Sequence, residues 1–312
     1  MKVYISKSID PFYNIALEDW LLQEVLRDDC ILYLWRNETS IIIGRSQNPW
    51  IECSKEVFLE NVPIIRRTSG GGTVYHDKGN INYSFLSKKN KFSKTNNFKL
   101  ILKTINTLGF KAYLSPREDI IVDQQGKRYK ISGNAFYFNK DKVLHHGTLL
   151  IDSDTKKLEK YLHHNVNRSL NGRGVKSVRS SIINLKDIIQ KTTVEKFISV
   201  LLSLNTTDIT FLPKCINNPH LLRIQKKIEK WEWTFGKSLN FSQVIPFKKN
   251  MIHLFVNEGK IQNINTDLEI FYIKDWFKKV KPRYEKFFLK EYLHIFHGKD
   301  RLIMMQIIKS IL

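Results

Sequence analysis

Short apolar or alternating runs and longer stretches with helical spacing follow one another along this chain. The short runs predict strands at residues 3–6, 31–35, 41–43, 62–65, 73–75, 80–85, 119–123, 129–132, 135–138 and 143–151. Helical spacing predicts helices at residues 11–27, 52–60, 97–108, 154–162 and 193–204. Asp10 before Pro11 is a typical helix start, and Gly109 is a typical helix end. The mixture predicts the α+β class, a mixed β-sheet flanked by helices.

The pattern resets near Phe241, after a long predicted loop at residues 165–181 and an aromatic cluster at residues 231–236. Beyond residue 248 the spacing predicts strands at residues 251–256 and 260–264, then helices at residues 268–280 and 301–312. A chain of 312 residues has enough material for one large and one small domain. We therefore predict domains at residues 1–242 and 248–312, the second a small α/β unit.

Three consecutive glycines, Gly70 to Gly72, follow the basic pair Arg66 and Arg67 and lie between two predicted strands, which indicates a hairpin with a tight turn. Glycine backbone can press closely against a ligand, and consecutive N–H groups in such a turn form a concave site for anionic oxygens. The arginines add donors suited to phosphate or carboxylate. No Gly-Lys-Ser/Thr follows these glycines, and the G-x-G-x-x-G spacing is absent, so the loop is neither a Walker A loop nor a dinucleotide fingerprint.

The formal charge of +21 suggests a nucleic-acid partner at first sight. The lysines are spread along the whole chain without one dense block, so we predict no specific nucleic acid. A basic surface instead favours an acidic protein substrate.

Cys30, Cys53 and Cys215 lie far apart and have no metal-ligand spacing, which indicates reduced thiols and an interior compartment. No run of 18 apolar residues occurs, so we expect no membrane span. The N-terminal residues lack the features of a signal or transit peptide. A cytoplasmic location is therefore favoured over the mitochondrial matrix, and a monomer is the default expectation.

A second constellation surrounds Lys130, which precedes Ser132-Gly133-Asn134 in a predicted strand pair. Strand alternation turns its neighbours to the opposite face, and Asp119 lies in the strand before it. The adjacent His145 and His146 would point opposite ways, so we expect one of them to face inward.

Together these residues resemble the lipoate–protein ligase A family, across residues 1–242. The motifs occur in family order: Trp35-Arg36-Asn37, Gly44-Arg45-x-Gln47-Asn48-Pro49-Trp50, Arg66-Arg67-x-Ser69-Gly70-Gly71-Gly72, His76-Asp77-x-Gly79-Asn80, Lys130-x-Ser132-Gly133, His145-His146-Gly147-Thr148, Ser177-Val178-Arg179-Ser180 and Trp231-Glu232-Trp233-x-Phe235-Gly236. The C-terminal unit resembles the family's accessory domain more weakly. Leu239 departs from a common proline, and we expect only a local loop difference there.

The resemblance implies a two-step activity. Lipoate and Mg-ATP give lipoyl-AMP and pyrophosphate, and the lipoyl group then passes to a specific lysine of a lipoyl domain. The implied acceptors are E2 subunits of 2-oxo-acid dehydrogenase complexes and the glycine-cleavage H protein. The implied cofactors are ATP and Mg²⁺, with lipoate as the substrate. Whether lipoate or octanoate is preferred stays open.

The resemblance also implies residue roles. A carboxylate that attacks an α-phosphate is anionic at close range, so cationic groups must gather there. The family pattern implies that Arg67 and the stretch Gly72, Thr73, Val74, Tyr75 contact the nucleotide. Lys130 then contacts both the ATP phosphate and the lipoyl carboxyl group as a cationic clamp, and it is the implied catalytic residue. Asp119 is the candidate magnesium ligand. Ser69 and His76 are expected to line the acyl pocket, and Arg179 lies in a loop that would close over the adenylate.

Several rival interpretations stay open. A cysteine-dependent acyltransferase needs a thiol in the pocket, and the three cysteines lie outside the core motifs. A biotin ligase would show a Lys-Trp-Pro-Asn-type element, which is absent from the sequence. A transferase that takes preformed lipoyl-AMP is the nearest rival, and the segment at residues 177–180 argues against it. A basic nucleic-acid-binding module is the rival from another class.

Overall fold

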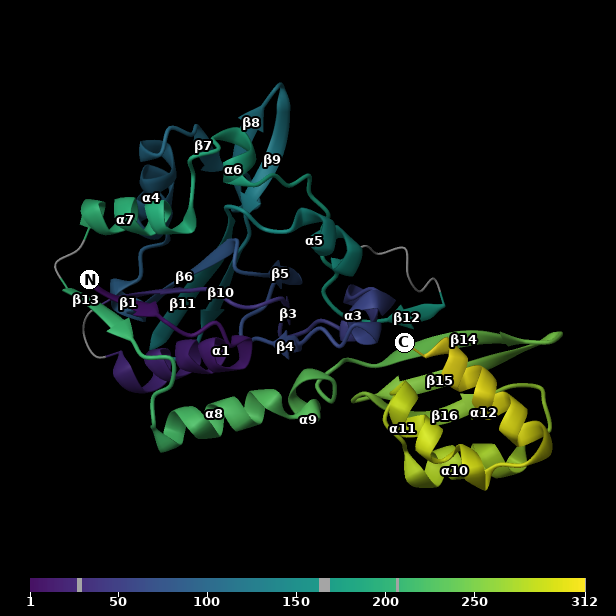
Figure 1. Cartoon of the computed structure of the whole chain (residues 1–312). Coiled ribbons are helices and arrows are strands. Elements are labelled where there is room, and N and C mark those ends of the chain that lie inside the picture. The colour runs from purple at the N-terminus through teal and green to yellow at the C-terminus, as the bar shows by residue number, and fades with distance from the viewer. Residues whose placement is uncertain (27–29, 163–168, 206–207, 312) are drawn as a thin grey trace. The chain divides into compact units, whose positions relative to one another are not determined.

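The computed structural model describes residues 1–26, 30–162, 169–205 and 208–311 (Figure 1). Its contacts divide the chain into two compact units. Unit 1 comprises Met1–Arg45, Pro63–Glu159 and Ser177–Glu229. Unit 2 comprises Ser46–Val62, Lys160–Lys176 and Lys230–Leu312. Helices and mixed sheets occur together, which confirms the predicted α+β class.

A six-stranded mixed sheet forms the centre of unit 1. Its strand order is β10 (Asn134–Phe138), β11 (Lys142–Leu150), β6 (Asn80–Lys88), β2 (Ile31–Trp35), β1 (Lys2–Ser6) and β13 (Asp208–Leu212). Strand β1 is parallel to both neighbours, and the other pairs are antiparallel. One face of the sheet is apolar and packs with α4 (Lys94–Thr107) and α7 (Val194–Asn205) in the main core. The opposite face carries buried polar side chains, among them Asn82, Ser84 and His146.

Two three-stranded sheets complete unit 1. One has the order β4 (Ile64–Arg66), β3 (Ser40–Ile43), β5 (Val74–His76), and the other has the order β7 (Ala112–Leu114), β8 (Ile120–Gln124), β9 (Lys127–Ser132). The predicted glycine hairpin is therefore wrong, because β3 lies between β4 and β5 and pairs with both. The glycines cross the end of β3 instead of forming a tight turn.

The helices of unit 1 begin and end near the predicted residues. Asp10 caps α1 (Pro11–Trp20) by accepting hydrogen bonds from the N–H groups of Phe12 and Tyr13. A π-helical turn, η1 (Leu21–Val25), continues α1, and the predicted end at residue 27 lies outside the described residues. The other elements are the turn η2 (Lys89–Lys91) and the helices α6 (Leu185–Ile188) and α8 (Pro219–Glu229). Helix α5 (Thr155–Leu162) agrees with its prediction.

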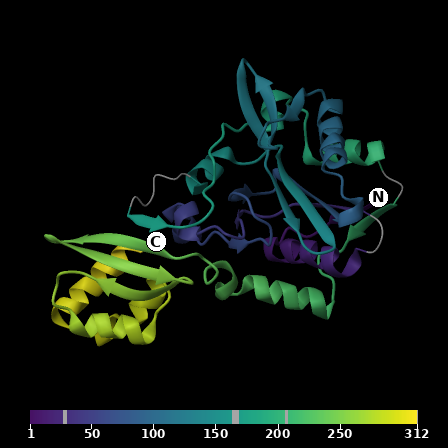
Figure 2. The same cartoon turned by 180° about the vertical axis from the view of Figure 1, so that it is seen from behind.

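Unit 2 is built on a four-stranded sheet. Its order is β12 (Leu170–Gly172), β14 (Phe241–Phe247), β15 (Asn250–Asn257), β16 (Lys260–Asn265). The helices α10 (Phe271–Val280), α11 (Lys286–Glu291) and α12 (Gly298–Ser310), with the turn η3 (Leu293–Ile295), gather on one face of the sheet, as the view from behind also shows (Figure 2). The rest of the unit comprises α2 (Pro49–Glu52), α3 (Lys55–Leu59) and α9 (Trp231–Thr234). Helix α3 lies within the helix predicted at residues 52–60 and is shorter, and α2 precedes it where a loop was predicted.

Strand β14 runs through the interval between the predicted domains at residues 1–242 and 248–312, and that domain division stays a prediction. Among the described residues, no helix combines the length and the apolar character needed to cross a membrane.

Candidate functional site

The glycine loop, residues 69–73, is held from within by the buried guanidinium of Arg67. Its Nη2 donates to the carbonyl oxygens of Gly70 at 2.6 Å and Gly72 at 2.7 Å, and Nη1 donates to the Ile42 oxygen at 3.1 Å. Nε donates to Ser69 Oγ at 3.0 Å. Burial lowers the pKa of Arg67 to about 10, so it stays cationic at neutral pH. Four of its five N–H donors are therefore used on the protein itself.

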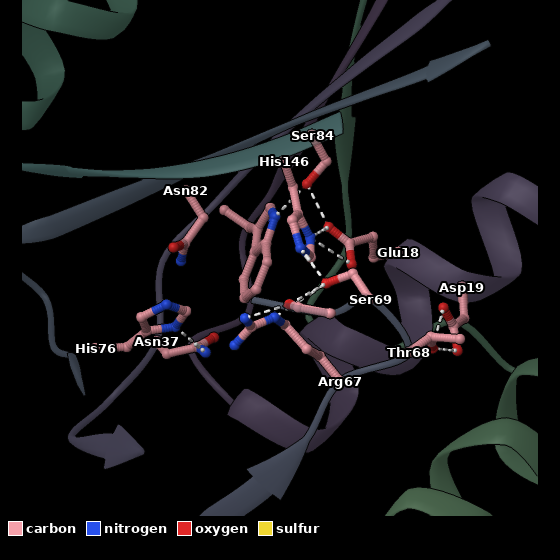
Figure 3. A network of polar contacts seen from close by, with 12 residues as sticks. Glu18, Asp19, Asn37, Arg67, Thr68, Ser69, His76, Asn82, Ser84 and His146 are labelled. Carbon is pink, nitrogen blue, oxygen red and sulfur yellow. Dashed lines mark hydrogen bonds and ion pairs between the residues drawn. The ribbon is translucent and has the colours of Figure 1, made fainter. Parts of the chain in front are cut away.

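A chain of hydrogen bonds continues from Ser69 to the polar face of the central sheet (Figure 3). His146 Nε2 lies 2.7 Å from Ser69 Oγ, and His146 Nδ1 lies 2.9 Å from Glu18 Oε1. The Ser84 hydroxyl donates to the same Glu18 oxygen at 2.5 Å and accepts from Trp35 Nε1 at 3.0 Å. Because a carboxylate only accepts, Glu18 orients the imidazole with a proton on Nδ1. Helix α1, strand β6 and strand β11 thus jointly fix the glycine loop.

His76 lies at the end of β5 in the same region. Asn14 Nδ2 donates to Asn37 Oδ1 at 3.0 Å, so the amide of Asn37 presents Nδ2 to His76 Nδ1 at 3.1 Å. His76 Nδ1 is therefore the acceptor, and its proton is on Nε2. Burial, with Arg67 and His146 nearby, lowers the pKa of His76 to about 3, so the ring is neutral at physiological pH.

Lys130 on β9 forms an ion pair with Asp119, with Nζ 2.8 Å from Oδ1. Arg117 lies farther from the same carboxylate, 4.0 Å from Oδ2. The Lys130 side chain is a quarter exposed, and a Cβ placed on Gly133 would lie 3.2 Å from its Nζ. Ile131 is fully buried in the core, which agrees with the predicted alternation along the strand.

One segment, residues 177–182, contacts both the glycine loop and β9. Ser177 Oγ accepts the N–H of Thr73 at 2.9 Å and would lie 3.2 Å from a Cβ on Gly72. The carbonyl of Ser181 accepts the N–H of Lys130 at 2.8 Å. This segment therefore joins the glycine loop to the strand that carries Lys130.

The structure brings most of the predicted site residues together. The glycine loop contains or is held by Arg67, Ser69, Gly72 and Thr73, and His76 adjoins it. In β5, Val74 is half-buried and Tyr75 is buried. Burial raises the pKa of Tyr75. The segment that carries Arg179, whose side chain is exposed, connects this group with Lys130 and Asp119. Cys53, in contrast, is a buried thiol of unit 2 whose pKa is raised by burial.

Asp119 is the candidate ligand through which this site could bind magnesium. Within the described ranges, no three His, Cys, Asp or Glu side chains gather as a metal site. Asp119 supplies one carboxylate, which fits Mg²⁺ that is bound mainly by phosphate oxygens and water.

Sequence reasoning missed Glu18 and the role of His146. His145 and His146 point to opposite faces of the sheet, as predicted, and only His146 faces the glycine loop, but His145 is also buried, on the other face. It packs against Phe98 and Phe136, and burial lowers its pKa to about 3. The sequence did contain a signal for Glu18, because it is a charged residue among the apolar residues Leu17 and Leu21 of a predicted helix.

Comparison with known proteins identifies the family. Residues 10–204 match the model of the lipoyl protein ligase A/B catalytic domain. The chain belongs to the lipoate–protein ligase family. A lipoate-protein ligase A of Bdellovibrio bacteriovorus is 32% identical over 285 residues, which cover 87% of this chain and 84% of the relative. One of Psychrobacter cryohalolentis is 35% identical over 284 residues, covering 85% and 82%. This chain is accordingly a ligase.

The fold of this ligase is also found in solved structures. P. falciparum LipL1 in complex with lipoate covers 100% of this chain, and the chain covers 99% of it, with a TM-score of 0.64 and 29% identity. A lipoate-protein ligase A bound with ATP gives a TM-score of 0.57 at 21% identity over 75% of this chain and 98% of that one, and it supports the fold alone.

Proposed function

We propose that this ligase activates lipoate with ATP and transfers the lipoyl group to a specific lysine of lipoyl domains. In the first step a lipoate carboxylate oxygen attacks the α-phosphorus, and the bond to pyrophosphate breaks. In the second step the lysine nitrogen of the acceptor attacks the acyl carbon, AMP leaves, and the lysine nitrogen loses its proton. The acceptors are E2 subunits of 2-oxo-acid dehydrogenases and the glycine-cleavage H protein.

One observation carries this proposal. The Arg67-held glycine loop and Lys130 are hydrogen-bonded to the two ends of one short segment, residues 177–182. A site bracketed by one segment in this way suits a molecule that carries phosphate at one end of a short linkage and an acyl carboxyl group at the other. A relative supports the choice of substrate, since P. falciparum LipL1 is described in complex with lipoate, and a ligase that shares this fold is described as bound with ATP. A further one, from Thermoplasma acidophilum, is described together with its E2 lipoyl domain.

The residues then divide the work. The stretch Gly72 to Tyr75 contacts the nucleotide, and Arg67 holds the loop in shape as it does so. Lys130 lies between the phosphate and the lipoyl carboxyl group, where its charge stabilises the anionic transition state. Ser69 and His76 adjoin the acyl chain, Asp119 is the protein ligand of Mg²⁺, and Arg179 closes over the adenylate. Mg²⁺ supplies charge neutralisation at the phosphates.

The test is pyrophosphate release from ATP, Mg²⁺ and lipoate without an acceptor protein. Lys130→Ala should lower this rate by roughly two to three orders of magnitude, because one preorganised donor to the transition state is lost. Lys127→Ala is the matched control, since Lys127 is on the same strand and exposed to solvent, and it should leave the rate unchanged.

Two outcomes would contradict the proposal. If wild type releases no pyrophosphate but transfers lipoyl from supplied lipoyl-AMP, the protein is an adenylate-dependent transferase. If it does neither, the assignment of lipoate chemistry fails. A monomer and a cytoplasmic location stay predictions of the sequence.

A further inference from the structure

A groove on unit 1 lies between helix α4 and the loop that leads from β7 to β8 (Figure 1). Its volume is about 490 Å³. It is lined along α4 from Lys94 to Asn106, and on the other side by Leu114 and Glu118. None of the predicted site residues lines it, although Glu118 directly precedes Asp119. We call it the α4 groove.

The floor of the α4 groove is apolar and is fixed by the core. Phe98 is 3% exposed and packs against the His145 ring, with centroids 4.7 Å apart. Leu102 and Leu114 are partly buried and pack against the main core of the unit. Because the core already orders these side chains, the floor can bind an apolar group without a further cost of ordering.

The rim of the α4 groove is cationic. Its described lining residues include three lysines, Lys94, Lys99 and Lys103, and one acid, Glu118, so the groove has a net charge of +2. Lys94 forms an ion pair with Glu118. Lys99 and Lys103 are exposed, and neither forms an ion pair within the described part of the chain. Two like charges one helical turn apart repel each other, so an anionic partner that binds both is favoured.

The end of the groove at Glu118 adjoins the predicted site. The side-chain N–H of Asn134 donates to the carbonyl oxygen of Glu118 at 3.0 Å. Asn134 begins β10 and follows Gly133, where a Cβ would lie 3.2 Å from Lys130 Nζ. Asp119, the residue after Glu118, forms the ion pair with Lys130. A protein bound along the groove therefore lies beside the site at which an acceptor lysine must arrive.

We propose that the α4 groove is the docking surface for the acceptor domain, which places two carboxylates on Lys99 and Lys103 and an apolar side chain on the floor. This inference rests on the proposed function, in which the acceptor is a lipoyl domain. Charge selects the occupant, because an acidic domain neutralises the two lysines, whereas a second copy of this chain, with its formal charge of +21, is repelled. A nucleic acid would pair with the lysines through phosphate but would leave the apolar floor without an apolar side chain. Docking beside the site raises the local concentration of the acceptor lysine.

The experiment measures lipoyl transfer by the full chain from lipoyl-AMP to an apo lipoyl domain of negative net charge. Lys99→Glu/Lys103→Glu should lower kcat/KM for the acceptor roughly tenfold or more, chiefly through KM, because the reversed charges repel the acidic domain. Pyrophosphate release from ATP and lipoate should stay unchanged, because neither lysine belongs to the site. Lys99→Arg/Lys103→Arg keeps both charges and should keep the transfer rate.

The matched control is Arg223→Glu/Lys226→Glu on α8, which makes the same change in net charge. Both residues are exposed, and α8 lines no described part of the groove. This pair should leave kcat/KM for the acceptor within about threefold of wild type, because salt at physiological concentration screens charges more than about 8 Å from the interface.

Several outcomes would overturn the inference. Unchanged transfer by Lys99→Glu/Lys103→Glu, or an equal loss in the α8 pair, would show that the groove has no part in docking beyond its share of the net charge. A loss of pyrophosphate release in the groove pair would show that the lysines act on the site itself. Tighter binding of duplex DNA than of the lipoyl domain, lost in the groove pair, would assign the groove to nucleic acid.

The proposed function is tested separately by the wild type. If the wild type transfers nothing from lipoyl-AMP, the proposed function fails, and calorimetry with the same apo domain then tests the groove alone. Binding that only Lys99→Glu/Lys103→Glu loses would support the groove, and no binding to the wild type would overturn it.

Discussion

Gly44→Ala tests whether the position of the glycine loop controls activity, without changing any polar side chain. Gly44 follows β3, directly where the glycine loop crosses. A Cβ on Gly44 would lie 2.2 Å from the carbonyl oxygen of Gly71 and 3.3 Å from Arg67 Nη2. Ordinary contact begins near 3.4 Å, so the loop backbone must move by about 1 Å to accept the methyl group.

The cost of that movement follows from what holds the loop. Arg67 donates to the carbonyls of Gly70 and Gly72, and Arg45 N donates to the Ser69 oxygen at 2.8 Å. Hydrogen bonds to a charged group contribute about 1.5–3 kcal/mol each, so distorting the two from Arg67 should lower the free energy of unfolding by roughly 3 kcal/mol. A displacement of about 1 Å in a positioned group can reduce a rate about 100-fold. We therefore expect lipoate-dependent pyrophosphate release to fall by about two orders of magnitude.

The control is Gly109→Ala, at the end of α4. Gly109 has φ +100°, so alanine is strained there, yet its nearest contact would be an ordinary 3.4 Å to Ile189. It should lose about 1–2 kcal/mol of stability and keep its specific activity. Both variants are compared by chemical unfolding and by the pyrophosphate assay under folded conditions. Equal activity of Gly44→Ala and Gly109→Ala would refute the reasoning, since the loop would then tolerate the shift or not take part.

Two further predictions concern charge. Burial raises the pKa of Asp19 from 3.8 to about 6, so the folded state binds the proton more tightly than the unfolded state does. The free energy of unfolding should therefore fall by up to about 3 kcal/mol as the pH rises from 4 to 6. Asp19→Asn, whose amide oxygen still accepts from Thr68, should remove this fall in urea unfolding curves recorded across that pH range; an unchanged slope would contradict it. The net charge of +21 predicts that salt slows lipoyl transfer to an acidic acceptor domain more than it slows adenylation, and an equal salt dependence of the two rates would count against a charge-guided encounter.

Local signals predicted those elements whose ends are set by nearby residues. Asp10 and Pro11 begin α1 because the cap and the fixed φ act within one turn. The glycine hairpin failed because its strands pair with β3, which comes earlier in the chain, and alternation alone does not identify the partner. Strand β13 escaped notice because four of its five residues are exposed and it pairs with the distant β1.

Motifs identified the residues of the site but not their partners. Ser69 and His146 occur in separate motifs 77 positions apart, and Glu18 is 128 positions from His146. Only the register of β6 and β11 against α1 joins them into one chain of hydrogen bonds.

The two predicted cations of the site differ in a way that only the structure reveals. Arg67 is buried and bound to backbone carbonyls, and taking it from them would leave both the guanidinium and the carbonyls without partners. Lys130 is partly exposed and paired with a carboxylate. A phosphate group could replace Asp119 as the anionic partner of Lys130. Mg²⁺ could replace Lys130 as the cationic partner of Asp119. Exchange of partners on binding Mg-ATP would therefore leave no charge unpaired. By this reasoning Arg67 shapes the site, whereas Lys130 is the cation that is free to follow the reacting groups.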